Sequence, residues 1–124
     1  MALTWGADTS GGTQLTTVDN VTEEFFDTID SSDAYQTQIE VLANNESGSV
    51  TDALVVAIYL TLDTATHDWD DQAYQTFTFL PTAITEVKTS FILSTVYTWR
   101  IGCLSAGATD LYTVDMNYRE LTGV

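Results

Sequence analysis

The chain has 124 residues, of which 18 are acidic and 3 are basic, so its formal net charge is -15 at neutral pH. Hydrophobic residues make up 44% of it, a fraction ordinary for one globular domain and too high for a disordered chain. Because only Lys88, Arg100 and Arg119 could neutralise phosphates, the charge argues against binding to nucleic acid or to an anionic membrane surface. It permits attraction to cations or to a basic partner surface.

Residues 1–20 are rich in Thr and Gly, and they predict an extended N-terminal arm with at most one short strand. Leu3 and Trp5 indicate that the very end of this arm is tucked against something. The remaining residues, 21–124, are long enough to bury a core of their own and are expected to form a single domain.

Short runs of Thr, Val, Tyr, Ile and Phe alternate with polar residues throughout that domain, and turn residues separate the runs. The pattern predicts seven antiparallel strands, at residues 22–29, 34–43, 53–62, 73–80, 86–93, 96–104 and 111–121. Strands of this number and spacing favour an all-β fold, an antiparallel two-layer β-sandwich of immunoglobulin-like or jelly-roll connectivity. Periodicity does not choose between these two connectivities.

The last two strands can be registered as a hairpin with its apolar residues on one face, with a loop at about residues 105–110. This register sets Trp99 opposite Met116 on the inner face and Arg100 opposite Asp115 on the outer face. The inner row is then Tyr97, Trp99, Ile101, Cys103, Tyr112, Val114, Met116 and Tyr118. The stretch is therefore interpreted as scaffold, with Cys103 as a buried packing residue.

The same reasoning predicts a second hairpin, with its turn at residues 81–85. Here Phe77 faces Thr89, and Phe79 faces Val87. Both hairpins would then present one apolar face and one polar face, as a sheet with one solvated side does.

The strand predicted at 53–62 has two apolar rows, since Val55, Ala57 and Tyr59 alternate with larger aliphatic residues. Its outer row is either covered by the arm or a loop, or it belongs to an oligomer or partner interface. Together with Leu3 and Trp5, these three residues are the candidate interface residues.

Nucleophilic catalysis requires a base beside a Ser or Cys and a group that orients the base. The only histidine, His67, falls in an acidic loop, and the only cysteine is predicted to face the core. No catalytic residues are predicted, and the chain is not expected to be an enzyme.

Four aspartates, Asp63, Asp68, Asp70 and Asp71, fall within nine positions of one inter-strand loop. Calcium takes six to eight oxygen ligands in irregular loops, so these residues are a candidate calcium site. The alternative is an acidic turn that Trp69 anchors on the sandwich. Apart from this possible calcium ion, no cofactor is expected.

Three segments carry a resemblance: "MALTWGADTSGGTQLTTVD", "LTLDTATHDWDDQAYQTFTF" and "YTWRIGCLSAGATDLYTVDMNYRELTG". Together they resemble small acidic β-sandwich structural proteins of tailed bacteriophages. An aromatic-Arg-aliphatic-Gly run and a terminal Asp-x-x-Tyr-Arg strand recur in that group. The resemblance implies no catalytic residues. It implies a virion component made in the host cytoplasm, with a capsid decoration or cement protein fitting the size best.

The expected partners are accordingly other virion proteins, above all the major capsid protein, with the chain as a homo-oligomer or bound to the lattice. One alternative is a calcium- or carbohydrate-binding module of a tail or fibre, in which Trp69 and Tyr74 could stack on a sugar. Another is an acidic mimic of DNA that inhibits a nuclease, which only the charge favours.

Overall fold

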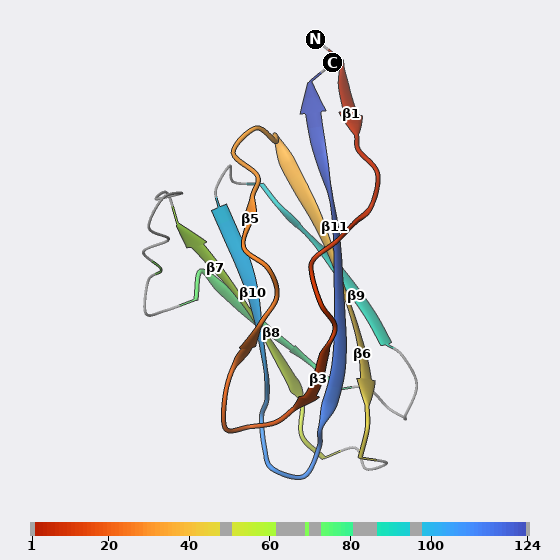
Figure 1. Ribbon diagram of the computed structural model, residues 1–124, viewed down its shortest axis with the longest axis vertical. Helices are drawn as coiled ribbons and strands as arrows, with labels where there is room; N and C mark the ends of the chain where they lie inside the picture. Colours follow the sequence, from red (N-terminus) through yellow and green to blue (C-terminus); the bar gives the residue numbers. More distant parts are fainter. Residues whose placement is uncertain are drawn as a thin grey trace.

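The computed structural model describes residues 2–47, 51–61, 69, 73–80, 87–94 and 98–123. In these residues the fold is all-β and consists of two antiparallel sheets packed face to face (Figure 1). The first sheet contains β1 (Leu3–Trp5), β2 (Thr9–Ser10), β3 (Leu15–Val18), β6 (Gln36–Asn45), β9 (Val87–Leu93) and β11 (Tyr112–Gly123). The second contains β4 (Glu24–Phe25), β5 (Ile29–Asp30), β7 (Leu54–Thr61), β8 (Gln75–Phe79) and β10 (Thr98–Ser105). The predicted β-sandwich is confirmed, and each of the seven predicted regions contains strand.

The strand order decides between the two connectivities. The strands β1, β2 and β3 follow one another along the same edge of β11, and β4 and β5 do the same along β10, so each set forms one interrupted edge strand. Counting each set once, the first sheet has the order 1-8-3-6 and the second has the order 2-7-4-5. Two four-stranded sheets whose first and last strands lie side by side are the jelly-roll arrangement.

The N-terminal arm is more regular than its sequence predicts. All three of its short strands pair with β11, so it supplies one interrupted edge strand of the jelly roll. The pairing is broken at Gly12, which has a φ of 121°, and at Thr17, which has a φ of 53°. These interruptions divide the alternation into pieces too short to predict a strand from the sequence.

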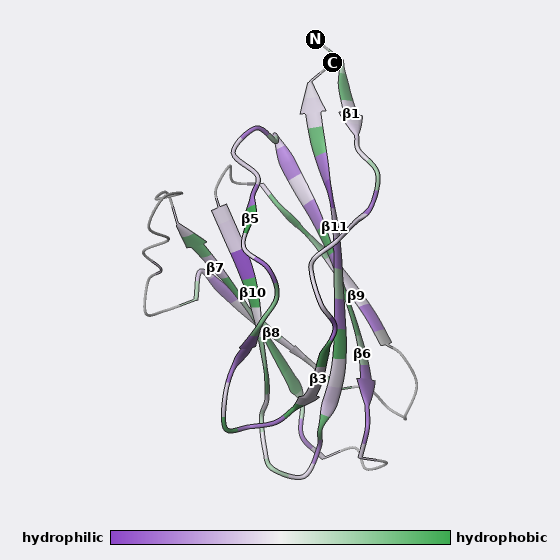
Figure 2. Cartoon of the chain, in the orientation of Figure 1, coloured by the Kyte–Doolittle hydropathy of each residue, from purple (hydrophilic) through white to green (hydrophobic). Residues whose placement is uncertain are grey.

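The core lies between the sheets, and the strands alternate hydrophobic and hydrophilic residues along their length (Figure 2). Trp99 of β10 is fully buried, and its indole Nε1 donates a hydrogen bond of 2.8 Å to the Ser31 hydroxyl. The other largest fully buried side chains of the two sheets are Tyr112, Ile39, Leu54, Ile58, Ile101 and Met116. The predicted inner face of the last two strands is therefore confirmed for the residues that the structure describes.

Both predicted hairpin registers are wrong. β10 pairs with β7, whereas β11 pairs with β6, so Arg100 lies opposite Tyr59 and Asp115 lies opposite Leu42. The apolar rows do meet, but across the core: the Trp99 and Tyr118 rings are 5.5 Å apart with an interplanar angle of 89°. Alternation defines which residues face inward, and it cannot distinguish a neighbour within the sheet from one across it.

The second predicted hairpin fails for the same reason, because β8 pairs with β7 and β9 pairs with β6. The Phe77 and Phe91 rings nevertheless pack edge to face, with centroids 5.0 Å apart, from opposite sheets. The predicted pairs Phe77 with Thr89 and Phe79 with Val87 do not form.

Candidate interface sites on the two outer faces

The outer face of the second sheet carries a cluster of aromatic rings around one arginine. The Arg100 guanidinium carbon lies 3.9 Å from the Phe25 ring centroid, 4.7 Å from that of Trp69 and 5.7 Å from that of Tyr59. Its Nε is buried and has no hydrogen-bond partner among the described residues. The cation is therefore held mainly by ring faces, an arrangement whose strength increases when water is excluded. We call Arg100, Phe25, Tyr59, Trp69 and Glu23 the Arg100 cluster.

Gly102 makes room for this cluster. It lies beside Phe25 in the pairing of β10 with β4. A Cβ atom at this position would lie 2.3 Å from the Glu23 Oε1 and 2.8 Å from the Phe25 ring. A glycine within a strand often marks such a close approach of another segment. The run Trp99-Arg100-Ile101-Gly102 thus alternates core residues with the two outer positions on which the cluster depends.

Tyr59 and Glu23 form the polar edge of the cluster. The Tyr59 hydroxyl lies 2.9 Å from each carboxylate oxygen of Glu23, to which it donates a hydrogen bond. Burial, the hydrogen bond to Glu23 and the negative charge of Glu23 raise the pKa of Tyr59 to about 12, against a smaller opposing effect of Arg100. The phenol therefore remains a hydrogen-bond donor throughout the neutral pH range.

The cluster accounts for much of the second apolar row of β7. Ala57 is only 4% exposed, and Tyr59 contacts Phe25 with ring centroids 5.7 Å apart. The cover comes from residues 23–25 and from Trp69, whose ring packs against Arg100. The arm lies in the other sheet, so Leu3 and Trp5 share no strand pairing with β7. The five candidate interface residues, Leu3, Trp5, Val55, Ala57 and Tyr59, thus fall in two separate regions, and their role in an interface stays a prediction.

On the first sheet, a second arginine holds the N-terminal arm. The Arg119 guanidinium carbon lies 4.7 Å from the Trp5 ring centroid, and its Nε donates a 2.7 Å hydrogen bond to the side-chain oxygen of Gln38. Earlier on β11, Asp115 accepts a 2.8 Å hydrogen bond from the Gln14 side-chain amide. We call these two contacts, Arg119 with Trp5 and Asp115 with Gln14, the arm contacts. These contacts account for Asp115 and Arg119 in the Asp-x-x-Tyr-Arg run. Tyr118, the tyrosine of that run, packs against the core.

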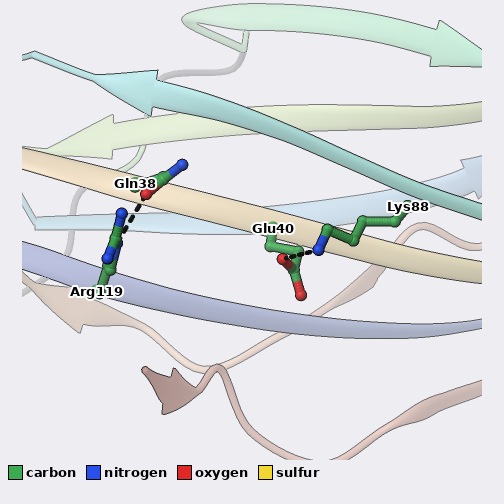
Figure 3. A network of polar contacts seen from close by, with 4 residues as sticks. All are labelled: Gln38, Glu40, Lys88 and Arg119. Atoms are coloured by element: carbon green, nitrogen blue, oxygen red, sulfur yellow. Dashed lines mark hydrogen bonds and ion pairs between the residues drawn. The ribbon is translucent and has the colours of Figure 1, made fainter. Parts of the chain in front are cut away.

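Beside the arm contacts lies a polar hollow of about 190 Å³, lined by Asp8, Gln38, Glu40, Asn117, Tyr118 and Arg119. Figure 3 shows Gln38 directed toward Arg119, and Glu40 directed toward Lys88. The Lys88 Nζ is 3.0 Å from the Glu40 carboxylate. Each of the three basic side chains of the protein is thus engaged, two by aromatic rings and one by an acid.

A pair of aspartates joins the loops at one end of the sandwich. Asp110 is fully buried, and its carboxylate accepts backbone N–H bonds of 2.7 Å from Thr51 and from Asp52. In return, the Asp52 carboxylate accepts bonds of 2.8 Å from Thr109 N–H and 3.2 Å from Asp110 N–H. Because each carboxylate binds the backbone of the other segment, this pair fixes the connection between β10 and β11 against the start of β7.

Cys103 is fully buried and is not in a disulfide. Burial, with smaller contributions from Glu23 and Glu24, raises the pKa of its thiol well above the ordinary range. This fits the prediction of a packing residue, because a reactive cysteine requires an accessible thiolate.

The candidate calcium ligands Asp63, Asp68, Asp70 and Asp71 lie outside the described residues, as does His67. In the part of the chain that is described, no group of three or more His, Cys, Asp or Glu residues is placed to hold a metal ion. The described residues likewise contain no helix that could cross a lipid bilayer. Tyr74, a candidate sugar-stacking residue, is 56% exposed, while Trp69 is occupied by Arg100.

The sequence reasoning missed the Arg100 cluster and the arm contacts. One usable signal was Gly102, since a glycine inside a strongly predicted strand indicates a close approach from outside the sheet. The polar partners Gln14 and Glu23 gave no signal, because their contacts depend on which strands share an edge.

No family model matches the chain, and no curated protein matches it. Among solved structures, it is similar to one described as "Bacillus endospore appendages form a novel family of disulfide-linked pili". The identity is 15%, the TM-score is 0.44, and the match covers 98% of this chain and 89% of that chain. Similarity at this level carries no inference about function.

Proposed function

We propose that this protein is a non-enzymatic structural component of a tailed-bacteriophage virion, which decorates the capsid by docking on the major capsid protein. The sequence resemblance supports the virion setting. The observation that carries the docking role is the distribution of charge over the outer surface.

Negative charge dominates that distribution. The chain has 18 acidic residues, and each of its three cations is already engaged within the molecule. The surface offered to a partner is therefore acidic, and two copies in solution repel one another. A basic partner surface would attract it, increase the rate of encounter and give a binding that weakens with salt.

Mass spectrometry of purified virions tests the virion setting. The protein is expected in many copies per particle. Its absence from particles made by cells that express it would overturn the proposal.

Capsids that lack the protein test the docking role. The purified protein is expected to bind them, with an affinity that falls as the salt concentration rises. Binding to purified tails but not to such capsids would place the protein elsewhere in the virion and contradict decoration.

A further inference from the structure

The N-terminal arm consists of two parts that are held very differently. From Gly11 onward it is anchored: Gly11 is buried, Val18 is fully buried in the core, and Leu15 packs against the core. Residues 2–10 are exposed throughout except for Trp5, which is partly buried, and Leu3 is 49% exposed. Removing residues 2–10 from the sheet would therefore uncover little of the core.

The outer part pairs with an end of β11 that has little other support. β6 pairs with β11 as far as Leu121, whereas Thr122 and Gly123 pair, among the described residues, with β1 alone. Figure 1 shows this two-stranded ribbon projecting beyond the rest of the sandwich, with both chain ends at its tip. An isolated pair of strands is only marginally stable in water.

The contacts that hold residues 2–10 in place could equally be supplied by β11 of another copy of the chain. They are the β1 and β2 pairings, the 2.8 Å hydrogen bond from Gly6 N–H to the Glu120 carbonyl, and the contact of Trp5 with Arg119. Each of them is directed at β11 and at no other strand. The polar hollow beside Asp8 further limits the contact of this segment with the sheet.

The charge of the segment also differs from that of the rest of the molecule. Asp8 is the only one of the 18 acidic residues that lies before residue 19. Two copies of the body repel each other, but an almost neutral strand can cross between them at little electrostatic cost. Gly11 is the first residue of the anchored part, and a glycine at this boundary tolerates the change of backbone direction that a crossing strand requires.

We propose that residues 2–10 are exchanged between copies of this chain, so that β1 and β2 of one copy pair with β11 of a second copy. Trp5 of the first copy then packs against Arg119 of the second, in place of the second copy's own Trp5. Exchange of an identical element requires no new interface, because the contacts within one copy are reused between copies. The exchange does not rest on the capsid assignment, since it takes place between copies of the purified chain.

Engineered disulfides test the exchange directly. Thr4 lies opposite Thr122 in the register of β1 with β11. Two variants, Thr4→Cys and Thr122→Cys, are unfolded together in denaturant, refolded as an equimolar mixture and oxidised. Exchange predicts a covalent dimer of one variant with the other on a non-reducing gel, identified by mass spectrometry of the linked peptides.

The matched control replaces Thr122→Cys by Thr113→Cys, on the same strand but about 30 Å away along it. Cysteines that far apart cannot be bridged, so exchange predicts about tenfold less mixed dimer for this pair. Equal yields from the two mixtures, or no mixed dimer from either, would overturn the proposal. Circular dichroism checks that each variant retains the β-fold.

Light scattering of the unsubstituted chain provides a test without new cysteines. At the same concentration, exchange predicts a mass at least twice that of one chain. A strict monomer would contradict the exchange and would leave the capsid proposal standing.

Discussion

Arg100 and Arg119 have similar surroundings, but they hold parts of the molecule that are anchored to different degrees. Each lies on the outer face of a sheet and packs on a tryptophan from a different part of the chain, Trp69 for Arg100 and Trp5 for Arg119. Three rings surround Arg100, whereas Arg119 contacts one ring, which belongs to an exposed edge segment. The same interaction therefore supports the body of the sandwich in one place and an exposed edge segment in the other.

The largest effect is expected from Gly102→Ala in the Arg100 cluster. The added methyl group would lie within 2.8 Å of the Phe25 ring and closer still to Glu23, so one of the two must move. We expect the free energy of unfolding to fall by about 2 to 3 kcal/mol, measured by chemical denaturation. Gly6→Ala in the arm is the matched control, because its Cβ would meet only the Glu120 carbonyl oxygen at 3.6 Å. Equal stability of Gly102→Ala and the unsubstituted protein would contradict the close packing of the cluster.

The arginines themselves give the direct comparison. Arg100→Met should lower the free energy of unfolding by about 1 to 2 kcal/mol, because a partly desolvated cation is lost from three rings. Arg119→Met should cost less than about 1 kcal/mol, because its ring partner is in the exposed segment. Hydrogen exchange should separate them further, with residues 3–10 exchanging faster in Arg119→Met only. If both variants accelerated hydrogen exchange at residues 3–10, the Arg100 cluster and the arm would not be independent.

A smaller effect of opposite sign is expected at Thr17. A β-branched residue at a φ of 53° is strained, since its Cβ approaches the following carbonyl oxygen. Thr17→Gly should therefore raise the free energy of unfolding by about 0.5 kcal/mol, because the strain it relieves exceeds the freedom that glycine adds to the unfolded chain. Thr16→Gly, one position earlier in the same strand, should lower it, because there glycine only adds freedom to the unfolded chain. A loss of stability in Thr17→Gly would show that its side chain does more than the backbone suggests.

The smallest effect under ordinary conditions concerns Tyr59, because it emerges only in alkali. Its pKa is raised from 10.0 to about 12 in the folded protein, so the folded state holds the phenolic proton more tightly than the unfolded state does. The associated stability is complete below pH 10 and is lost as the pH rises toward 12. Denaturation midpoints measured across this range should fall less steeply for Tyr59→Phe. Tyr74→Phe, a change at an exposed tyrosine, is the matched control. An identical slope in both variants would show that Tyr59 does not contribute to the loss of stability in alkali.

The sequence predicted burial more successfully than it predicted strand partners. Burial of Trp99, Cys103 and Met116 follows from alternation, because a period of two places them on one face whatever their partners are. Strand partnership depends instead on the path of the whole chain. Arg100 lies opposite Tyr59 and not Asp115 because the connection between β10 and β11 crosses from one sheet to the other. No local pattern encodes that crossing.

The same limit applies to the outer faces. The two apolar rows of β7 correctly indicated that its outer side needs cover, but the cover comes from residues 23–25, which were predicted as part of one continuous strand. That stretch is divided into β4 and β5 because the pairing with β10 shifts by one residue between Phe25 and Ile29. Such a shift depends on how the segment packs against β10, which the local sequence does not reveal.

The position of the first strand beside the last has a consequence for how the chain folds during synthesis. Leu3 emerges from the ribosome well before its partner Gly123, because the two lie far apart along the chain. Pairing between such distant segments is slow to form, and domains are generally completed only when their last element is available. The arm therefore waits without its native partner while neighbouring ribosomes on the same message produce further copies. That interval is when a strand from one nascent chain can reach the completed sheet of another.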